Sequence, residues 1–496
     1  MYKKLLSETA LYGISTILAR LVNYLLVPLH TGTLPTDDYG IVSEFYAIAA
    51  FLNVVYTYGM ETTYFRFSSK NDDIRFSRKT YNVALTSLVI SSTIFSGTFY
   101  LLSRPLANTL GYPNSFYFVE WFALLIAIDA IVSIPFAHLR QTHQAQKFVA
   151  LKLFNVFLNV GLNYFFFWFC PTYERHPFWS QLISLVYNPT IGLGYAFFSN
   201  LIANLLFIPL LWKEFLQWRP TLDRPLLKEM LSYGLPLLVG GIAYTINETL
   251  DRILIKYWLP DGFYEGKSNL DAVGIYSGCY KLSIFISLAI QGYRFAAEPF
   301  FFQQVKNKNS PQTFSLTMHY FIVVCCLMLL AVCANLTWLA DLFLRHDAYR
   351  EGLVVVPFLL MANVMLGIYF NLSVWYKTTD KTHYGASISL IGAAITLLLN
   401  YLLIPHLGYV GSAITTLVCY TTMTVLCYML GKKYQPIPYK VLSASLYLLG
   451  SFTLAWAFFF WKIHNYWLEF LVKNLILVSV AFFVVWLERK SFQPMV

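Results

Sequence analysis

The sequence predicts an all-α membrane protein of about fourteen transmembrane helices: two six-helix lobes in a pseudo-two-fold parallel repeat, followed by two C-terminal helices. Three observations predict this fold: the low charge content, the number of apolar runs, and motifs that recur in the second half. Of 496 residues, 57% are hydrophobic and 12% are charged, and the mean hydropathy is +0.56. Because a soluble chain carries about a quarter charged residues, the expected solvent is lipid. A soluble enzyme with one anchor is excluded.

The apolar residues form runs long enough to cross a bilayer, which takes about 20 residues per helix. Helix is the one open-chain element that satisfies its own backbone in hydrocarbon, so each run is predicted to be a helix. The fourteen runs lie near residues 9–30, 40–64, 81–103, 116–139, 148–169, 190–212, 230–258, 271–300, 316–340, 352–375, 383–404, 408–430, 438–461 and 466–487.

The basic residues are distributed unevenly between the segments that join these runs. With a cytoplasmic N-terminus, 23 of the 35 Lys and Arg residues fall in inner segments. Six fall in outer segments: Arg104, Arg175, Lys267, Arg345, Arg350 and Lys462. By the positive-inside rule, both termini are expected to be cytoplasmic. The net charge of +10 is therefore interpreted as loop charge, and no nucleic-acid partner is expected because no soluble basic domain is present.

Short motifs recur in the same order in the two halves of the chain. Gly40-Ile41 opens the second run and Gly274-Ile275 opens the eighth. The fifth and eleventh runs share Leu-Asn-Tyr at 162–164 and 399–401, and the sixth and twelfth share Leu-Gly-Tyr at 193–195 and 407–409. Six is an even number of crossings, so both lobes start on the same side and the repeat is parallel. We therefore predict an N-lobe at 1–218, a C-lobe at 219–434, and helices 13 and 14 with a short tail at 435–496.

Ionisable residues within the runs are the candidate functional residues, because a charge at mid-bilayer costs about 2.5–3.5 kcal/mol on insertion scales. Arg20 lies near the middle of the first helix, with Asn23 on the same face. It either faces a polar cavity or pairs with Asp129 of the fourth helix. Asp129 is in turn either that partner or a carrier of a coupling proton or cation.

The seventh and eighth helices carry the densest set of charges. Glu248, Asp251 and Arg252 share one face, which is expected to line water or protein, although Glu248 and Arg252 are four residues apart and could neutralise each other. Lys281 has no partner at helical spacing in its own helix. Arg294 and Glu298 form a second such pair towards the inner end, and Glu61 occupies the matching end of the second helix, which favours a shared gate.

No enzyme motif or metal-ligand spacing is present, so the sequence predicts no enzymatic activity and no cofactor. The seven cysteines lack ligand spacing and are interpreted as small buried apolar residues. Without an ATPase motif, transport would be coupled to protons, to sodium or to the membrane potential.

The chain resembles the polysaccharide flippases of the multidrug/oligosaccharidyl-lipid/polysaccharide exporter (MOP) superfamily. The resemblance rests on the plan of six, six and two helices, the motif Gly234-Leu235-Pro236, the pair Asp251-Arg252 and the motif Gly274-Ile275-Tyr276. It implies two bundles around a cavity that opens alternately to either side of a bacterial inner membrane. The implied cargo is an oligosaccharide on a polyprenyl diphosphate, flipped from the inner to the outer leaflet during surface polysaccharide or lipopolysaccharide synthesis.

In this interpretation the diphosphate binds Arg20, Asn23, Arg252, Lys281 and Arg294. Coupling or gating falls to Asp129, Glu248, Asp251, Glu61 and Glu298, and helices 13 and 14 cover a groove for the lipid tail. The other expected partners are membrane lipids and glycan polymerase machinery, and a monomer is expected.

Two other functions are considered. The acidic residues keep a cation-coupled drug antiporter of the MATE type as the alternative. A membrane-embedded glycan polymerase or ligase is disfavoured because the longest outer loop, near 170–190, holds one Arg and one Glu. Lipid II is a doubtful cargo, since lipid II flippases cluster several arginines in the N-lobe, and here only Arg20 lies clearly at mid-depth.

Overall fold

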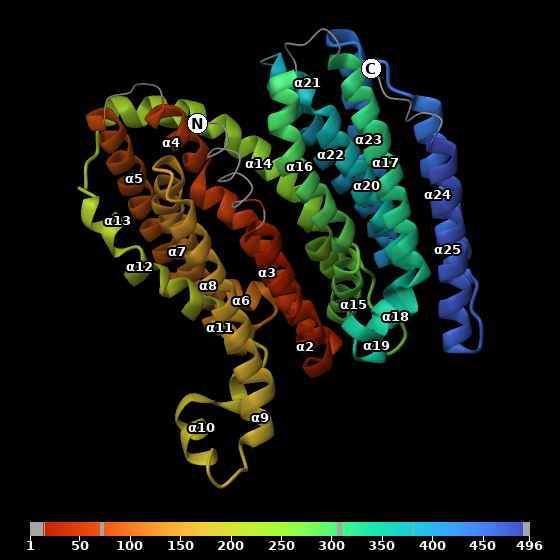
Figure 1. The fold of residues 1–496 in the computed structure, drawn as a ribbon. Helices are drawn as coiled ribbons and strands as arrows, with labels where there is room; N and C mark the ends of the chain where they lie inside the picture. Colours follow the sequence, from red (N-terminus) through yellow and green to blue (C-terminus); the bar gives the residue numbers. More distant parts are fainter. Residues whose placement is uncertain (1–12, 14, 70–73, 305–309, 380, 490–496) are drawn as a thin grey trace. The chain divides into compact units, whose positions relative to one another are not determined.

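The computed structural model describes residues 13, 15–69, 74–304, 310–379 and 381–489, and the side chains at 295, 296, 298–304 and 310 lie outside this description. The described part of the chain is helical and contains no strand (Figure 1). It forms two compact units, unit 1 at Met1–Ile253 and unit 2 at Leu254–Val496. An all-α membrane fold, as predicted from the sequence, is therefore confirmed.

Unit 1 begins with a helical segment at 15–24 and ends within the long helix α14. Its helices are α2 (Leu26–Thr33), α3 (Thr36–Thr57), α4 (Met60–Ser68), α5 (Ile74–Leu101), α6 (Ser103–Leu110), η1 (Pro113–Ser115), α7 (Phe116–Gln141), α8 (Ala145–Tyr164), η2 (Phe165–Phe169), α9 (Cys170–Tyr173), α10 (Ser180–Val186), η3 (Pro189–Ile191), α11 (Gly194–Leu205), α12 (Phe207–Leu210), α13 (Trp212–Gln217) and α14 (Arg224–Trp258).

Unit 2 continues from the end of α14 to the last described residues. Its helices are α15 (Asn269–Lys281), α16 (Ile284–Gln304), α17 (Ser310–Ala334), α18 (Leu336–Phe343), α19 (Asp347–Arg350), η4 (Glu351–Val355), α20 (Val356–Leu372), α21 (Val374–Thr378), α22 (His383–Leu407), α23 (Tyr409–Tyr434), α24 (Val441–Phe460) and α25 (Tyr466–Arg489).

Within the described residues, every apolar run predicted from the sequence coincides with helix, but the count of fourteen spans is not established. Among the described residues, eleven helices are long and apolar enough to cross a membrane, and a bent pair raises the number to twelve. The sixth run is a shorter apolar helix, Gly194–Leu210, and the start of the first run lies outside the described residues. The eighth run is broken between α15 and α16, which meet at 47°.

The core of unit 1 lies around α7, which packs against α3, α5 and α11. The first part of α14 joins the same unit, because Leu226 and Met230 are buried against Tyr64 and Leu88. Here two glycines bring backbones into contact: a Cβ on Gly59 would lie 2.9 Å from the carbonyl oxygen of Gly234. The compact unit thus extends to residue 253, beyond the lobe boundary predicted at 218, and the three-part division stays a prediction.

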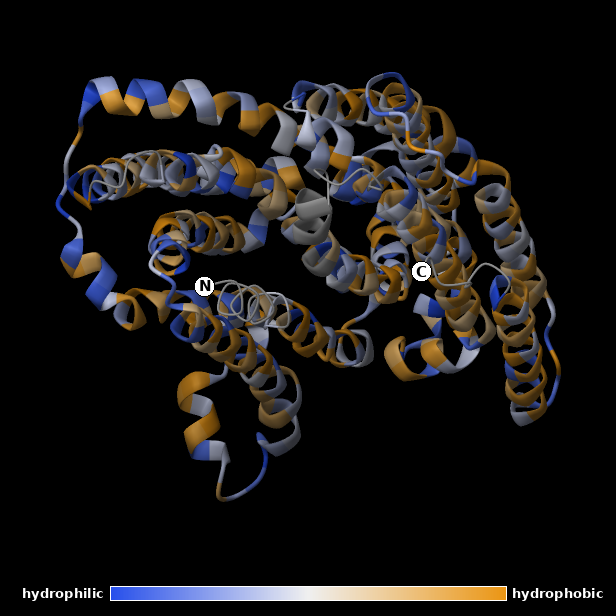
Figure 2. Ribbon diagram, turned by 45° about the horizontal axis from the view of Figure 1, so that its top comes forward, coloured by the Kyte–Doolittle hydropathy of each residue, from blue (hydrophilic) through white to orange (hydrophobic). Residues whose placement is uncertain are grey.

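In unit 2, α20 packs between α17 and α23, and α24 packs on α17. Helices α24 and α25 lie at the edge of this unit in both views, and their hydrophobic residues dominate the ribbon there (Figure 1, Figure 2). Side chains such as Leu449, Leu475 and Phe482 are exposed, as expected for helices that face lipid. These are the two helices predicted to follow the second lobe.

Candidate functional site

Arg20 lies in the helical segment at 15–24, where Val22 and Tyr24 are buried and Arg20 and Asn23 are exposed on unit 1. Within the described part of the chain, no residue forms a hydrogen bond or ion pair with Arg20. The pairing of Arg20 with Asp129, which the sequence left open, is therefore not formed in this structure. If this segment crosses the membrane as predicted, a guanidinium that no described residue pairs with has to face water, protein or an anionic ligand.

Asp129 instead belongs to a polar cluster inside unit 1. Asn204 of α11 donates a hydrogen bond of 2.8 Å to Asp129 Oδ1, and Asn155 of α8 donates one of 2.8 Å to Asn204 Oδ1. The charge of Lys152, also on α8, acts on the Asp129 carboxyl. Lys152 lies over the ring of Phe136, with its Nζ 4.3 Å from the ring centroid.

Sequence reasoning missed three of these residues. Lys152 falls within the predicted run at 148–169 but was counted among the basic residues of the inner segments, whereas α8 begins at Ala145 and carries Lys152 in its first half. The sequence could have indicated part of this cluster, because Asn155 is three residues from Lys152 and therefore lies on the same face of the helix. The contact with Asn204 depends on the packing of α8, α7 and α11, which no local pattern encodes.

The charged face of α14 is partly buried within unit 1. Asp251 is buried and Arg252 is half-buried. The Arg252 guanidinium lies 3.4 Å from Asp251 Oδ1 and donates a hydrogen bond of 3.1 Å to the main-chain oxygen of Glu248. Its charge also acts on the hydroxyl of Tyr39 of α3. The sequence suggested that the side chains of Glu248 and Arg252 could form an ion pair. In the structure, Arg252 instead contacts the carboxylate of Asp251 and the main-chain oxygen of Glu248.

Lys281 is the last residue of α15 and lies at the break that replaces the predicted single helix at 271–300. Ser283, two residues after Lys281, is buried, and Asn363 of α20 donates a hydrogen bond of 3.2 Å to its hydroxyl. Ser287 of α16 in turn donates one of 2.9 Å to Asn363 Oδ1. A buried polar network therefore stabilises the break and places the half-buried Lys281 beside it.

The predicted gating residues have contacts in their own units. Glu61 pairs with Arg140 at 2.8 Å in unit 1, and both side chains are exposed. In unit 2, the Arg294 guanidinium lies 4.0 Å from the ring centroid of Phe370. The side chain of Glu298 lies outside the described residues, so its predicted pairing with Arg294 stays a prediction.

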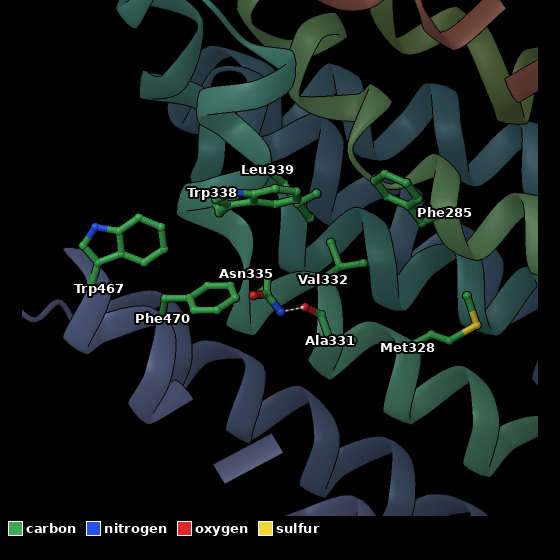
Figure 3. A pocket seen from close by; sticks show the side chains of 9 residues that line it. All are labelled: Phe285, Met328, Ala331, Val332, Asn335, Trp338, Leu339, Trp467 and Phe470. Atoms are coloured by element: carbon green, nitrogen blue, oxygen red, sulfur yellow. Dashed lines mark hydrogen bonds between the residues drawn. The ribbon is translucent and has the colours of Figure 1, made fainter. Parts of the chain in front are cut away.

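An apolar pocket of about 510 Å³ opens on unit 2 beside α25 (Figure 3). It lies between α16, α17, α18 and α25, and its walls include Phe285, Met328, Trp338, Trp467 and Phe470. The one polar side chain in this lining, Asn335, is engaged by Ala331 O and by Asn474. Such a surface can accommodate a hydrocarbon chain, and its lining contains no charged side chain to attract a phosphate.

The described residues contain no cluster of three or more His, Cys, Asp or Glu side chains that could hold a metal ion. All seven cysteines are free and buried.

The fold resembles that of solved MOP-superfamily transporters. One solved structure is the lipid II flippase MurJ in an inward closed conformation, with a TM-score of 0.73, 12% identity, and coverage of 98% of this chain and 100% of that one. Another is an inward-facing multidrug resistance MATE family transporter of the MOP superfamily, with a TM-score of 0.66, 13% identity, and coverage of 84% and 94%. A third is the Vibrio cholerae MATE transporter VcmN in the bent form, with a TM-score of 0.54, 14% identity, and coverage of 92% and 98%.

The likeness to these structures shows that the chain has their fold. Its described residues include eleven helices that are long and apolar enough to cross a membrane. The model of one protein family, described as "Polysaccharide biosynthesis protein", matches residues 5–305, more than half of the chain. The chain belongs to this family, and the resemblance inferred from the sequence is confirmed. No curated protein sequence matches the chain.

Proposed function

We propose that this chain flips a polyprenyl-diphosphate-linked oligosaccharide from the inner to the outer leaflet of a bacterial inner membrane by alternating access, for surface polysaccharide or lipopolysaccharide synthesis. The observation that carries the proposal is the family match over residues 5–305. The chain is expected to transport without making or breaking covalent bonds, and to work as a monomer beside glycan polymerase machinery with both termini in the cytoplasm.

The chemistry of this cargo explains why cations lie in apolar helices. A diphosphate cannot cross hydrocarbon, so it needs charge-assisted hydrogen bonds along its path. Arg20 is exposed on unit 1 and has no ion pair with a described residue, which suits a guanidinium that binds a transient anion. Arg252 has a buried carboxylate beside it, so it contributes less positive potential than Arg20. Lys281 would act from the break in unit 2.

The polyprenyl tail needs an apolar path, and the pocket beside α25 supports this part of the proposal (Figure 3). Its aromatic walls would contact isoprene units while the tail stays continuous with the bilayer. The position of the pocket at α25 agrees with the role that the family resemblance assigns to the last two helices.

The test is complementation in a strain that lacks its own flippase, with surface polysaccharide as the readout. Arg20→Ala, Arg252→Ala, Lys281→Ala and the triple variant are compared at equal membrane abundance. Arg350→Ala is the matched control, because Arg350 is paired with Asp341 and Asp347 in a segment predicted to lie outside. Loss of a charge-assisted hydrogen bond of about 1.5–3 kcal/mol predicts a loss of headgroup affinity of tenfold or more. Full activity of the triple variant would end the assignment of these residues.

Coupling is proposed at Asp129. Asp129→Asn preserves the side-chain shape but removes the charge that acts with Lys152. We expect this variant to be abundant in the membrane and inactive in complementation. Asn155→Ala, which removes the outer hydrogen bond of the cluster, should retain partial activity. Equal activity of Asp129→Asn and the wild type would remove Asp129 from the coupling mechanism.

A cation-coupled drug antiporter of the MATE type is the second candidate. The polar cluster at Asp129 favours it, because a buried carboxylate held by Asn204 is suited to exchange a proton for a cationic substrate. A drug-sensitivity panel on overexpression tests it. Altered resistance together with unchanged surface glycan would support the antiporter and contradict the flippase.

A further inference from the structure

A second pocket in unit 2 lies between α17, α20, α23 and α24. Its volume is about 170 Å³, and its lining is mostly apolar, with Met318, Ile368 and Leu448 among its walls. It shares no lining residue with the pocket beside α25, and none of the described residues of α25 lines it. Val425 of α23 and Val441 of α24 line it and are exposed, so the pocket opens sideways between these two helices.

The pocket occupies one end of these helices. On α24 it extends from Val441, the first residue of the helix, to Leu448. At a rise of about 1.5 Å per residue this depth is about 11 Å, well under half of a hydrocarbon core of about 30 Å. On α23 the lining begins at Thr424, in the last part of the helix. The pocket therefore matches the acyl region of one leaflet, on the side that the positive-inside rule assigns to the cytoplasm.

The rim of the pocket at this end is basic. Lys440, just before α24, is exposed and lines the pocket. A smaller hollow that shares three residues with the pocket adds Lys432 and Gln435. Neither lining contains an acidic residue. Glu488 of α25 attracts Lys440, but its carboxylate is also engaged by Tyr447, which donates a hydrogen bond of 2.7 Å to it.

The basic surplus extends along this part of the sequence. Between residues 356 and 460, one acidic residue, Asp380, stands against five lysines: Lys377, Lys381, Lys432, Lys433 and Lys440. Such a surplus beside an apolar pocket favours a ligand that joins an anionic group to a hydrocarbon chain.

The polar groups at the rim have donors to offer such a ligand. Within the described part of the chain, the ammonium groups of Lys432 and Lys440 and the hydroxyl of Tyr439 donate no hydrogen bond. The rim segment itself is held in place, because Ser315 of α17 donates a hydrogen bond of 2.6 Å to the main-chain oxygen of Pro438. An anion at the rim would therefore meet positioned donors.

We propose that this pocket binds one anionic phospholipid of the adjoining leaflet. The phosphate and the anionic headgroup contact Lys432, Lys440 and the Tyr439 hydroxyl, and an acyl chain lies in the apolar slot between α23 and α24. A zwitterionic phospholipid fits less well, because its headgroup adds a cation beside two ammonium groups.

The lipid is a bound constituent of unit 2 and not the cargo. A transported headgroup has to cross the whole membrane, whereas this pocket ends about 11 Å from its rim, where Ile322 and Leu448 line it. A lipid held between α23 and α24 binds the folded unit and not the unfolded chain, so it stabilises the fold by mass action. The site uses none of the residues assigned to the cargo headgroup or to coupling.

The melting temperature of the purified full chain in a neutral detergent tests the proposal. The protein is titrated with dioleoylphosphatidylglycerol, which is anionic, or with dioleoylphosphatidylcholine, which has the same acyl chains and no net charge. Unfolding is followed by circular dichroism. We expect phosphatidylglycerol to give the half-maximal rise in melting temperature at a lipid concentration about tenfold or more below that of phosphatidylcholine.

A double lysine variant tests the rim. Lys432→Gln/Lys440→Gln should move the phosphatidylglycerol midpoint about tenfold towards that of phosphatidylcholine. Both lysines are exposed, so the variant is expected to fold. The matched control is Lys213→Gln/Lys228→Gln, which removes two exposed lysines of unit 1 and should leave the midpoint unchanged.

A matched pair of serine variants tests the apolar slot. Ser445→Phe places a ring in the pocket opening on α24 and should weaken the binding of both phospholipids. Ser479→Phe adds the same ring at an exposed position of α25 outside the pocket and should bind them like the wild type.

Equal midpoints for the two phospholipids in the wild type, an unchanged midpoint in the double lysine variant, or wild-type binding by Ser445→Phe would each overturn the proposal. A polyprenyl phosphate is titrated in parallel. A midpoint below that of phosphatidylglycerol, lost in the double lysine variant, would assign the pocket to the cargo and also overturn the proposal. No cargo is present in the other titrations, so their results are independent of the flippase assignment.

Discussion

The contact between Gly59 and Gly234 in unit 1 can be tested quantitatively, because the chain supplies matched glycines. Gly59 has φ of +70°, and a Cβ there would lie 2.9 Å from Gly234 O. Gly234 is helical, and its Cβ would lie 3.0 Å from the Tyr58 main-chain oxygen. Gly111 has φ of +87° with nothing within 4 Å of a Cβ, and Gly240 of α14 is helical with equally open space. Four alanine variants therefore separate backbone strain from packing.

The expected changes in unfolding free energy follow from these geometries. Gly240→Ala should stabilise by about 1 kcal/mol through helix propensity. Gly111→Ala should cost about 1–2 kcal/mol for the left-handed backbone. Gly234→Ala should cost about 1–3 kcal/mol for overpacking, offset in part by the same propensity gain. Gly59→Ala combines strain and overpacking, so about 2–5 kcal/mol is expected.

Unfolding in mixed detergent micelles, followed by circular dichroism, gives the four values on one scale. The reasoning predicts that Gly59→Ala is the least stable variant and Gly240→Ala the most stable. If Gly59→Ala is no worse than Gly111→Ala, and Gly234→Ala no worse than Gly240→Ala, the close approach of α14 does not contribute to the stability of unit 1.

Three further predictions concern helix ends and the break in unit 2. Asp223 caps α14 by accepting a hydrogen bond from Leu226 N, and its ion pair with Lys79 holds the pKa of its carboxyl below the usual range. Asp223→Asn should lower the melting temperature at neutral pH, and the difference from the wild type should shrink as the pH falls below about 4, where the wild-type carboxylate also loses its charge. Ser268→Ala removes half of the capping box of α15 and should cost about 1 kcal/mol in denaturant unfolding, whereas Ser268→Thr should not. Asn363→Leu leaves the buried Ser283 hydroxyl without its donor and should cost about 1–3 kcal/mol, measured by the same method.

The sequence predicted the helices well because lipid imposes a length and a composition on each span, and both can be read from local residues. It could not predict the break at Leu282 and Ser283, since neither residue is glycine or proline. The break depends on Asn363, 80 positions away in the chain, which supplies the hydrogen bond that a disrupted helix needs. The same limit applies to Lys152, which was counted as loop charge. Its neighbours, the ring of Phe136 and the carboxylate of Asp129, both come from α7, and the sequence does not show that α7 packs against this part of α8.

The ionisable residues in the spans show what a sequence leaves undecided about the candidate site. The sequence identifies these residues as costly, because each places a charge in an apolar helix. An ion-pair partner within the same unit neutralises that charge, so no ligand is needed to explain it. Glu61 has Arg140, Asp251 has Arg252, and Lys473 has Glu469. Arg20 differs, because no described residue of the chain pairs with it. A permanent partner would make Arg20 structural, whereas a guanidinium that has to bind and release a diphosphate in each cycle must be left without one. Arg20→Lys therefore separates a structural role of Arg20 from a role in diphosphate binding. It keeps the positive charge but loses the planar, bidentate guanidinium, so it should flip cargo more weakly than the wild type and better than Arg20→Ala.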